Sequence, residues 1–241
     1  MRLFAIADLH LSFGSNKPMD VFGPQWADHA ERLRAAWTET VAADDVVLVP
    51  GDISWAMHFP ELVPDFAFLD ALPGRKVLIR GNHDYWWSTL AKLDRFVDDH
   101  GFSTISFLRN SGLRLRGEDP DGPGTVICGT RGWLLPDDAG FSADDERILA
   151  REAGRLALSL ADGDRQRLAG DRLVVMLHYP PLGSGRAPTP FSEALEAHGA
   201  DLCLYGHLHG EAAARGVSGT VRGVLYRNAS ADHISFKPLR L

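Results

Sequence analysis

The stretch KVLIRGNHDYWW, residues 76–87, decides how this chain of 241 residues is interpreted. It begins as the apolar run of a buried strand and continues into a glycine and polar residues that a strand does not need. Asn82, His83 and Asp84 place an amide, an imidazole and a carboxylate directly after the run. Because ligands collect beyond the carboxyl ends of strands in open α/β sheets, we expect functional residues here.

The same pattern of an apolar run that stops in polar residues recurs along the chain. The runs are short and rich in β-branched residues, as expected of strands buried on both faces. They cover residues 3–7, 46–49, 77–79, 126–128, 173–177, 202–205 and 223–227. Helical patterns lie between them, at residues 26–43, 60–72, 88–100, 143–161 and 191–197. The fourth is expected to fray before Gly163, and the alternation as a whole predicts an α/β protein.

The composition is that of a soluble globular protein, with 45% hydrophobic and 24% charged residues. Neither a linker nor a low-complexity run divides the chain, so we expect a single domain over residues 1–241. The longest apolar runs are too short for a membrane span, and the first ten residues do not resemble a secretory leader. These features predict a cytoplasmic protein without a membrane partner.

The net charge restricts the possible partners, and the two cysteines indicate the state of the thiols. The formal net charge of -7 argues against a broad basic face for nucleic acid, whereas small anionic substrates remain compatible with a local pocket. Cys128 and Cys203 each lie inside an apolar run and form no metal-type cluster, so both are predicted to be buried thiols, with a disulfide as the alternative.

Five strand ends share one chemistry. In chain order they are D-x-H at Asp8 and His10, G-D at Asp52, G-N-H-D at residues 81–84, a histidine at His178, and G-H-x-H at His207 and His209. Carboxylate, imidazole and amide groups are borderline-to-hard metal ligands, and no thiolate occurs among them. One such histidine is usually a satisfied polar residue, but five such strand ends would require five separate coincidences. The pattern therefore predicts a metal site.

This series resembles the signature of the calcineurin-like metallophosphoesterase superfamily from Asp8 to His209. The resemblance implies a four-layer α/β/β/α sandwich with two mixed sheets and a site for two divalent metal ions. It assigns Asp8, His10 and His209 to the first metal, and Asn82, His178 and His207 to the second, with Asp52 bridging the two. Such mixed ligand sets suit Mn, Fe or Zn. A hydroxide shared by the metals would attack the phosphorus in line.

The resemblance also gives roles to residues that bind no metal. His83 would lie near the leaving group as a general acid or hydrogen-bond donor, and Asp84 would orient its ring. Arg80 matches an arginine that helps to grip the phosphate in protein Ser/Thr phosphatases. Those enzymes usually have glutamate where this chain has Asp84, so a surface ion pair remains the alternative for Arg80.

Four further residues are candidates for substrate contacts. The segment TVICGTRGW, residues 125–133, repeats the strand-end pattern outside the superfamily signature, so Arg131 could bind a phosphate or carboxylate and Trp133 could stack on a ring. Trp55 also follows a strand-end motif, with core packing as its alternative. Arg186 lies in YPPLGSGRAPTPF, residues 179–191, which is either a lid or a plain surface loop. The segment DPDGPG, residues 119–124, lacks the remaining ligands of a calcium loop.

The sequence therefore predicts a dinuclear metal-dependent hydrolase that acts on a small phosphorylated substrate. The ligands do not separate a phosphomonoesterase from a phosphodiesterase, because the same two metals serve both reactions. Two alternatives remain: a binding scaffold that has this fold without the chemistry, and a protein Ser/Thr phosphatase. A nuclease is disfavoured by the acidic balance of the chain.

Overall fold

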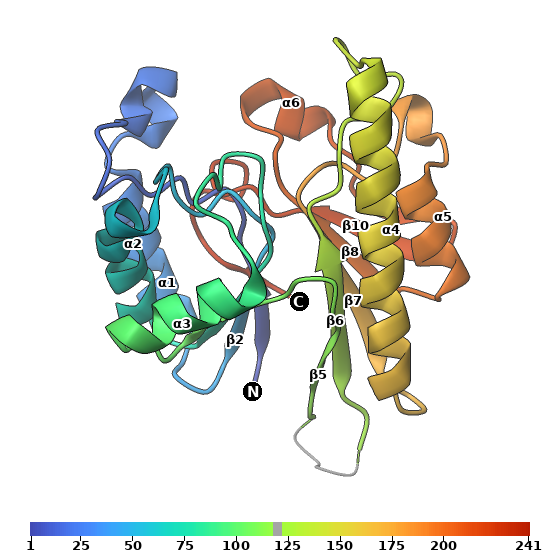
Figure 1. Ribbon diagram of the computed structural model, residues 1–241, viewed down its shortest axis with the longest axis horizontal. Helices are drawn as coiled ribbons and strands as arrows, with labels where there is room; N and C mark the ends of the chain where they lie inside the picture. Colours follow the sequence, from blue (N-terminus) through green and yellow to red (C-terminus); the bar gives the residue numbers. More distant parts are fainter. Residues whose placement is uncertain (118–121) are drawn as a thin grey trace. The chain divides into compact units, whose positions relative to one another are not determined.

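A computed structural model describes residues 1–117 and 122–241 (Figure 1). The chain divides into two compact units. Unit 1 consists of Met1–Phe107 and Ala229–Leu241, and unit 2 is the continuous segment Leu108–Asn228. The first residues of the DPDGPG segment lie outside the described residues, so the structure does not bear on its interpretation.

Unit 1 is built on a five-stranded mixed sheet in the order β11-β1-β2-β3-β4. Its strands are β1 (Leu3–Ala5), β2 (Val46–Val49), β3 (Arg75–Leu78), β4 (Ile105–Phe107) and β11 (Leu239–Arg240). The first four run parallel, and β11 pairs antiparallel with β1. All four residues of β2 are buried, as the apolar run at 46–49 predicts for a central strand.

The helices of unit 1 flank this sheet (Figure 1). They are α1 (His29–Thr40), α2 (Phe59–Ala71) and α3 (Leu90–His100), with the short 3-10 turns η1 (Met19–Phe22) and η2 (Pro24–Trp26) before α1. Trp37 is fully buried, and its indole N–H donates to the carbonyl of Pro73 over 2.8 Å. Leu33 and Trp37 form the apolar stripe expected of α1 and pack into the core of this unit.

Unit 2 contains a six-stranded mixed sheet in the order β5-β6-β7-β8-β10-β9. Its strands are β5 (Leu113–Leu115), β6 (Thr125–Thr130), β7 (Arg172–Leu177), β8 (Leu202–Tyr205), β9 (Gly219–Val221) and β10 (Val224–Asn228). The four central strands are parallel, whereas β5 and β9 form antiparallel edges. The carboxyl ends of β6, β7 and β8 therefore meet at one edge of this sheet.

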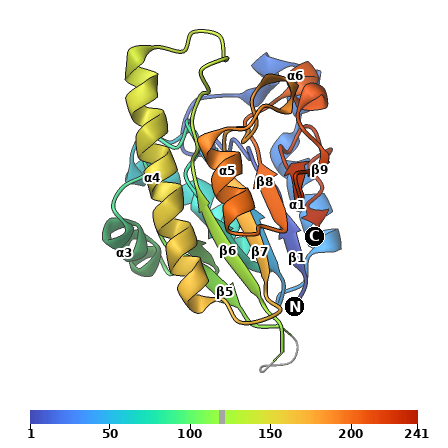
Figure 2. The same ribbon diagram turned by 90° about the vertical axis from the view of Figure 1, so that its right-hand side faces the viewer.

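Helix α4 (Ala143–Gln166) runs along the sheet of unit 2, next to α5 (Pro190–Ala197) (Figure 2). A capping box between Ser142 and Asp145 begins it. The expectation that it frays before Gly163 is wrong, because the helix continues through that residue. A side chain at Gly163 would collide with the Cys128 sulfur, so the glycine allows α4 to pack closely on β6. The remaining elements of unit 2 are η3 (Ser184–Arg186) and α6 (Gly210–Arg215).

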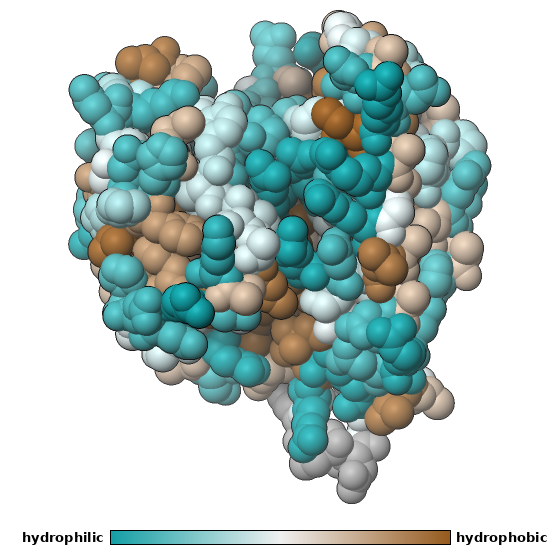
Figure 3. Space-filling view, in the orientation of Figure 1, coloured by the Kyte–Doolittle hydropathy of each residue, from teal (hydrophilic) through white to brown (hydrophobic). Residues whose placement is uncertain are grey.

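The predicted fold class is confirmed: the protein is α/β, with two mixed sheets flanked by helices. Among the strands and α-helices, the elements missed by the sequence are the edge strands β4, β5, β9 and β11 and the short helix α6, none longer than six residues. Cys128 and Cys203 are buried free thiols, as predicted. No helix in the described residues has the length and apolar character needed to cross a membrane. Hydrophilic residues cover most of the face in Figure 3, and hydrophobic ones lie among them in small groups.

Candidate functional site

Unit 1 places two buried carboxylates close together at the ends of neighbouring strands. Asp8 follows β1 and Asp52 follows β2, and both side chains are buried. Each offers an oxygen within 4.8 Å of the other. A ring nitrogen of His10 lies within the same distance of Asp8, and His10 Nε2 is 3.8 Å from Asp52 Oδ2. The structure thus brings together three of the four metal ligands that the sequence predicts in this unit.

The main chain at these three residues is in a conformation that L-amino acids seldom adopt. The φ angles are 58° at Asp8, 46° at His10 and 52° at Asp52. Main-chain hydrogen bonds between the two loops support this conformation. The N–H of Asp8 donates to the carbonyl of Gly51, and the N–H of His10 donates to the main-chain carbonyl of Asp52. Such backbone costs about 1–3 kcal/mol per residue and clusters at functional sites, where it aims side chains in directions that regular strands do not allow.

Asp84 joins the loop after β2 to the loop after β3. Its carboxylate is fully buried and accepts from four main-chain N–H groups, those of Asp52, Ile53, Ser54 and Gly81, over 2.7–3.3 Å. In the described part of the chain its hydrogen bonds all go to the main chain and none to the His83 ring. Asp84 therefore holds the two loops together, and its predicted role in orienting the His83 ring stays a prediction.

The surroundings of Asp84 also change its acidity. Burial, and then the nearby Asp52 carboxylate, raise the pKa of Asp84 to about 7, although hydrogen bonds from the main chain act in the opposite direction. Two adjacent buried carboxylates call for a compensating positive charge. At Gly81, a side chain would collide with Asp52, so only glycine allows this close approach.

The remaining residues of the G-N-H-D segment lie nearer the surface. Asn82 and His83 are half-buried, and the main-chain N–H of His83 donates to Asp52 Oδ1 over 2.8 Å. The His83 ring nitrogen Nδ1 is 3.4 Å from the Tyr85 hydroxyl. Arg80 is half-buried directly before this segment. The Asp52 carboxylate thus faces His10 and also positions the main chain beside Asn82.

Unit 2 supplies imidazoles at the ends of β7 and β8. His178 is fully buried, and its ring centroid lies 5.2 Å from that of His207 at 73°. His207 has a φ of 70°, and His209 lies at the start of α6. The N–H of Gly206 donates to the carbonyl of His178 and so joins the two strand ends. All three predicted histidine ligands of this unit therefore follow neighbouring strands at the same edge of the sheet.

Arg131 is buried against α4. Its guanidinium donates to Glu152 Oε1 over 3.1 Å, and the Thr130 hydroxyl donates to the other oxygen of Glu152. Its main-chain carbonyl accepts from the N–H groups of both His178 and Tyr179. These contacts identify Arg131 as a residue that supports the end of β7, whereas its predicted substrate contact stays a prediction.

Trp133 and Tyr179 form a small aromatic group beside His207. The Tyr179 ring lies 4.2 Å from the His207 ring and 5.2 Å from the Trp133 ring. Trp133 donates its indole N–H to Asp145 on α4 over 2.9 Å, and the Arg131 guanidinium lies 4.2 Å from its ring. Trp133 is only half-buried, so part of it stays available for the stacking contact that the sequence suggests.

Two other predicted substrate residues have different settings. Trp55 is only 7% exposed and packs against the rings of His10 and His83. Arg186 is exposed with a φ of 68°, and its carbonyl accepts from Arg222. Bonds at both ends fasten the loop around it, from Ser184 N–H to Asp137 and from the Thr189 hydroxyl to Pro181.

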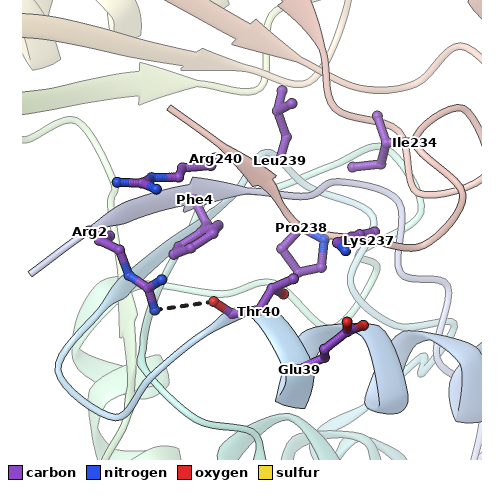
Figure 4. A pocket seen from close by; sticks show the side chains of 9 residues that line it. All are labelled: Arg2, Phe4, Glu39, Thr40, Ile234, Lys237, Pro238, Leu239 and Arg240. Atoms are coloured by element: carbon purple, nitrogen blue, oxygen red, sulfur yellow. Dashed lines mark hydrogen bonds between the residues drawn. The ribbon is translucent and has the colours of Figure 1, made fainter.

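A pocket of about 530 Å³ lies at the opposite end of the unit 1 sheet (Figure 4). It is lined by Arg2, Phe4, Glu39, Thr40, Ile234, Lys237, Pro238, Leu239 and Arg240. Arg2 is held by Asp45 and donates to the Thr40 carbonyl over 3.2 Å. Since Arg2 and Phe4 lie at the amino end of β1 and Asp8 follows its carboxyl end, this pocket is separate from the candidate ligands.

The donor set of both units fits divalent cations. Buried carboxylates in unit 1 provide the negative charge, and imidazoles in both units provide borderline nitrogen ligands. The sequence missed Asp84's main-chain contacts and the support that Glu152 gives to Arg131. Glu152 carried a detectable signal, because it lies on the apolar stripe of α4 with Leu149 and Leu156.

The fold and these strand-end residues define an α/β protein with a series of candidate metal ligands. Comparison with known sequences makes the class specific: the model of the calcineurin-like phosphoesterase family matches residues 1–211. The chain belongs to this family. No curated protein matches it.

Solved structures with low sequence identity share the fold. The phosphopantetheinyl hydrolase PptH of Mycobacterium tuberculosis is 17% identical with a TM-score of 0.58, over 100% of this chain and 95% of that chain. The protein TT1561 of Thermus thermophilus is 13% identical with a TM-score of 0.56, over 100% and 98% of the two chains. The protein AQ665 of Aquifex aeolicus, of unknown function, is 16% identical with a TM-score of 0.50, over 99% and 95%.

Proposed function

We propose that the protein hydrolyses phosphate esters with two bound divalent cations of the Mn, Fe or Zn type. The observation that carries this proposal is the pair of carboxylates of Asp8 and Asp52, which are buried within 4.8 Å of each other in unit 1 of a chain that belongs to this family. Two carboxylates in such a place are stabilised by a cation between them. When bound, the cations supply an activated water and neutralise charge on the phosphate.

Seven residues would hold the two cations. Asp8, His10, Asp52 and Asn82 come from unit 1, and His178, His207 and His209 come from unit 2. Asp52 is proposed as the shared ligand. The N–H of His83 donates to its Oδ1 and so fixes the direction of the carboxylate, which leaves Oδ2 on the side of His10. The substrate would be a small phosphorylated molecule in the cytoplasm.

His83 and Arg80 would act on the substrate itself. The half-buried His83 ring would donate a proton or a hydrogen bond to the leaving oxygen. Arg80 would donate two parallel hydrogen bonds to the phosphate oxygens, as a guanidinium does for a tetrahedral anion. Both contacts can form with the bound ester and with the charge that develops in the transition state. They are therefore proposed to orient the ester and also to stabilise the transition state.

The test is hydrolysis of a mono- and a diester by the same preparation. Protein stripped with chelator is refilled with Mn²⁺, Fe²⁺ or Zn²⁺ and assayed with p-nitrophenyl phosphate and bis-p-nitrophenyl phosphate. Metal-dependent turnover would support the proposal, and the ratio of the two rates would favour one ester class. A phosphopantetheine ester belongs in the panel because PptH, which shares the fold, is named a phosphopantetheinyl hydrolase. Two metals bound per chain without turnover on any ester would favour a binding scaffold.

Asp52→Asn is the sharpest variant for this proposal. It keeps the shape of the side chain but removes the shared negative charge, so turnover should fall by roughly 10³-fold or more. Metal analysis of the dialysed variant should show fewer than two metals per chain. Asp94→Asn on the exposed face of α3 is the matched control, with wild-type metal content and rate expected. Full metal content together with full activity in Asp52→Asn would remove Asp52 from the site.

A further inference from the structure

The indole of Trp55 lies among rings of the unit 1 part of the site. Its ring centroid is 4.9 Å from that of His10, with the planes at 21°, and 4.3 Å from that of His83. The centroids of His10 and His83 are themselves 5.8 Å apart. One indole therefore contacts both the imidazole proposed to bind metal and the imidazole proposed to face the leaving group.

The position of the indole is itself well determined. The main-chain N–H of Trp55 donates to Leu11, and its indole N–H points to the sulfur of Met19 at 3.0 Å. The Lys17 ammonium lies 3.3 Å from the ring centroid, and the Phe22 ring stacks parallel at 6.5 Å. With contacts on its edge and on its faces, the indole has little freedom to rotate.

We propose that Trp55 is a positioning residue that sets the ring planes of His10 and His83 relative to each other. The inference rests on the proposed function, which gives these two imidazoles their roles. The His10 ring is stacked on the indole and the His83 ring is tilted at 43° to it. A flat indole restricts the tilt of an imidazole packed against it, whereas an aliphatic side chain fills the same space without that restriction. His10 would hold the metal that binds the phosphate, and His83 would donate the proton to the leaving oxygen of the same bond. The placement of His83 relative to His10 therefore matters most when the leaving group needs the proton.

The test compares two esters with leaving groups of different quality. Phenyl phosphate needs more help from a proton donor than p-nitrophenyl phosphate, whose leaving group is already stable as an anion. Trp55→Leu should lower kcat/KM for phenyl phosphate by roughly 10–100-fold, at least about fivefold more than for p-nitrophenyl phosphate. Trp55→Phe keeps a flat ring and should restore the ratio to within about twofold of wild type.

A second measurement does not depend on activity. Chelator titration of the metal-loaded protein should show about tenfold weaker metal binding in Trp55→Leu than in wild type, because His10 loses its stacked partner. Trp37→Leu is the matched control, since it removes another buried tryptophan whose indole bonds to Pro73. It should lower stability but leave both the ester ratio and the metal affinity unchanged.

The outcomes separate this inference from the proposed function. If Trp55→Leu behaves like Trp37→Leu in both measurements, Trp55 is a packing residue and the inference is overturned. If wild-type protein hydrolyses none of the esters, the proposed function fails, and the metal titration alone decides for or against Trp55. If Trp55→Leu does not fold, Met19→Leu replaces it, because losing the sulfur loosens the indole and should shift the ester ratio by about twofold to threefold in the same direction.

Discussion

The two units hold their strand-end residues by different means. In unit 1 the main chain holds them: three of the polar residues have positive φ angles, and Asp84 accepts from four main-chain N–H groups. In unit 2 main-chain bonds also join the strand ends, and His207 has a positive φ, but side chains add to this support. Glu152 holds Arg131, and Tyr179 packs against His207. Carboxylates need a fixed direction and many donors, whereas imidazoles are large enough to be fixed by packing. Unit 1 should therefore be the more sensitive of the two to loss of one buried polar group.

The largest effect is expected from Asp84→Ala in unit 1. The change leaves four buried main-chain N–H groups without their acceptor, so the free energy of unfolding should fall by roughly 3 kcal/mol or more. The loops that carry Asp52 and Gly81 should also separate, and metal affinity should fall with stability. Urea unfolding with and without metal measures both effects.

Asp84→Asn sharpens the same experiment. The amide retains one acceptor oxygen but turns donors towards some of the N–H groups, so an intermediate loss is expected. Asp98→Asn, at an exposed position of α3, provides the control. A stable Asp84→Ala protein with normal metal binding would show that the main-chain contacts do not hold these loops.

A smaller effect is expected from Glu152→Gln in unit 2. The amide has the same shape but lacks the charge that balances Arg131 and Arg155, so the guanidinium of Arg131 should shift. Since the carbonyl of Arg131 holds the N–H groups of His178 and Tyr179, turnover should fall by about 10–100-fold, with a smaller loss of stability than in Asp84→Ala.

Exposed Glu146 on the same helix gives the control for this variant, since Glu146→Gln changes charge without a buried partner. Rates of both variants on the preferred ester, corrected for folded fraction, make the comparison. A Glu152→Gln protein with wild-type rate would mean that unit 2 does not depend on this ion pair.

The smallest effect is expected from neutralising one ion-paired carboxylate in each unit, Asp45 in unit 1 and Asp171 in unit 2. The loss of stability should be nearly equal in the two units. Burial pushes the pKa of Asp45 upwards, but hydrogen bonds from Arg2 and from Ala42 outweigh it and bring the pKa to about 2. In unit 2 the Arg114 guanidinium holds the pKa of Asp171 far below its usual range. A lowered pKa stabilises the fold above the unfolded value near pH 4, and this stability is lost as the pH falls towards the folded value.

We therefore expect Asp45→Asn and Asp171→Asn each to cost roughly 1–2 kcal/mol at pH 7 and less at lower pH. Unfolding by urea between pH 7 and pH 2.5 measures this dependence. The advantage of wild type over Asp171→Asn should persist to lower pH than its advantage over Asp45→Asn. An advantage that stays constant with pH would exclude the carboxylate charge as its source.

Much of the fold was predictable because its central strands are buried on both faces. Each such strand is an apolar run with a sharp polar end, and this pattern located the candidate ligands as well. The edge strands β4, β5, β9 and β11 escaped prediction, since an edge pairs on one side only and needs no continuous apolar run. The family and the fold class are confirmed, and the assignment of each ligand to one metal stays a prediction.

The support of the site was less predictable, because it depends on partners far apart in the sequence. Asp84 bonds to residues about thirty positions away, and no local pattern announces which main chain a carboxylate will meet. Asp65 is similar: it lies on the buried face of α2 and binds the Ser54 hydroxyl and the N–H of Phe13. In both cases an acidic residue in an apolar setting was the available signal.

The order of segments in unit 1 has a consequence for synthesis on the ribosome. Strand β1 has neighbours on both sides, and one of them, β11, is formed by Leu239 and Arg240. The N–H of Ala7 likewise donates to Ala229. Unit 2 is continuous and can pair all its strands as soon as Asn228 has emerged, whereas the nascent chain must keep β1 unpaired on one edge until residue 240 is free. We expect the unit made first to be the last to finish folding.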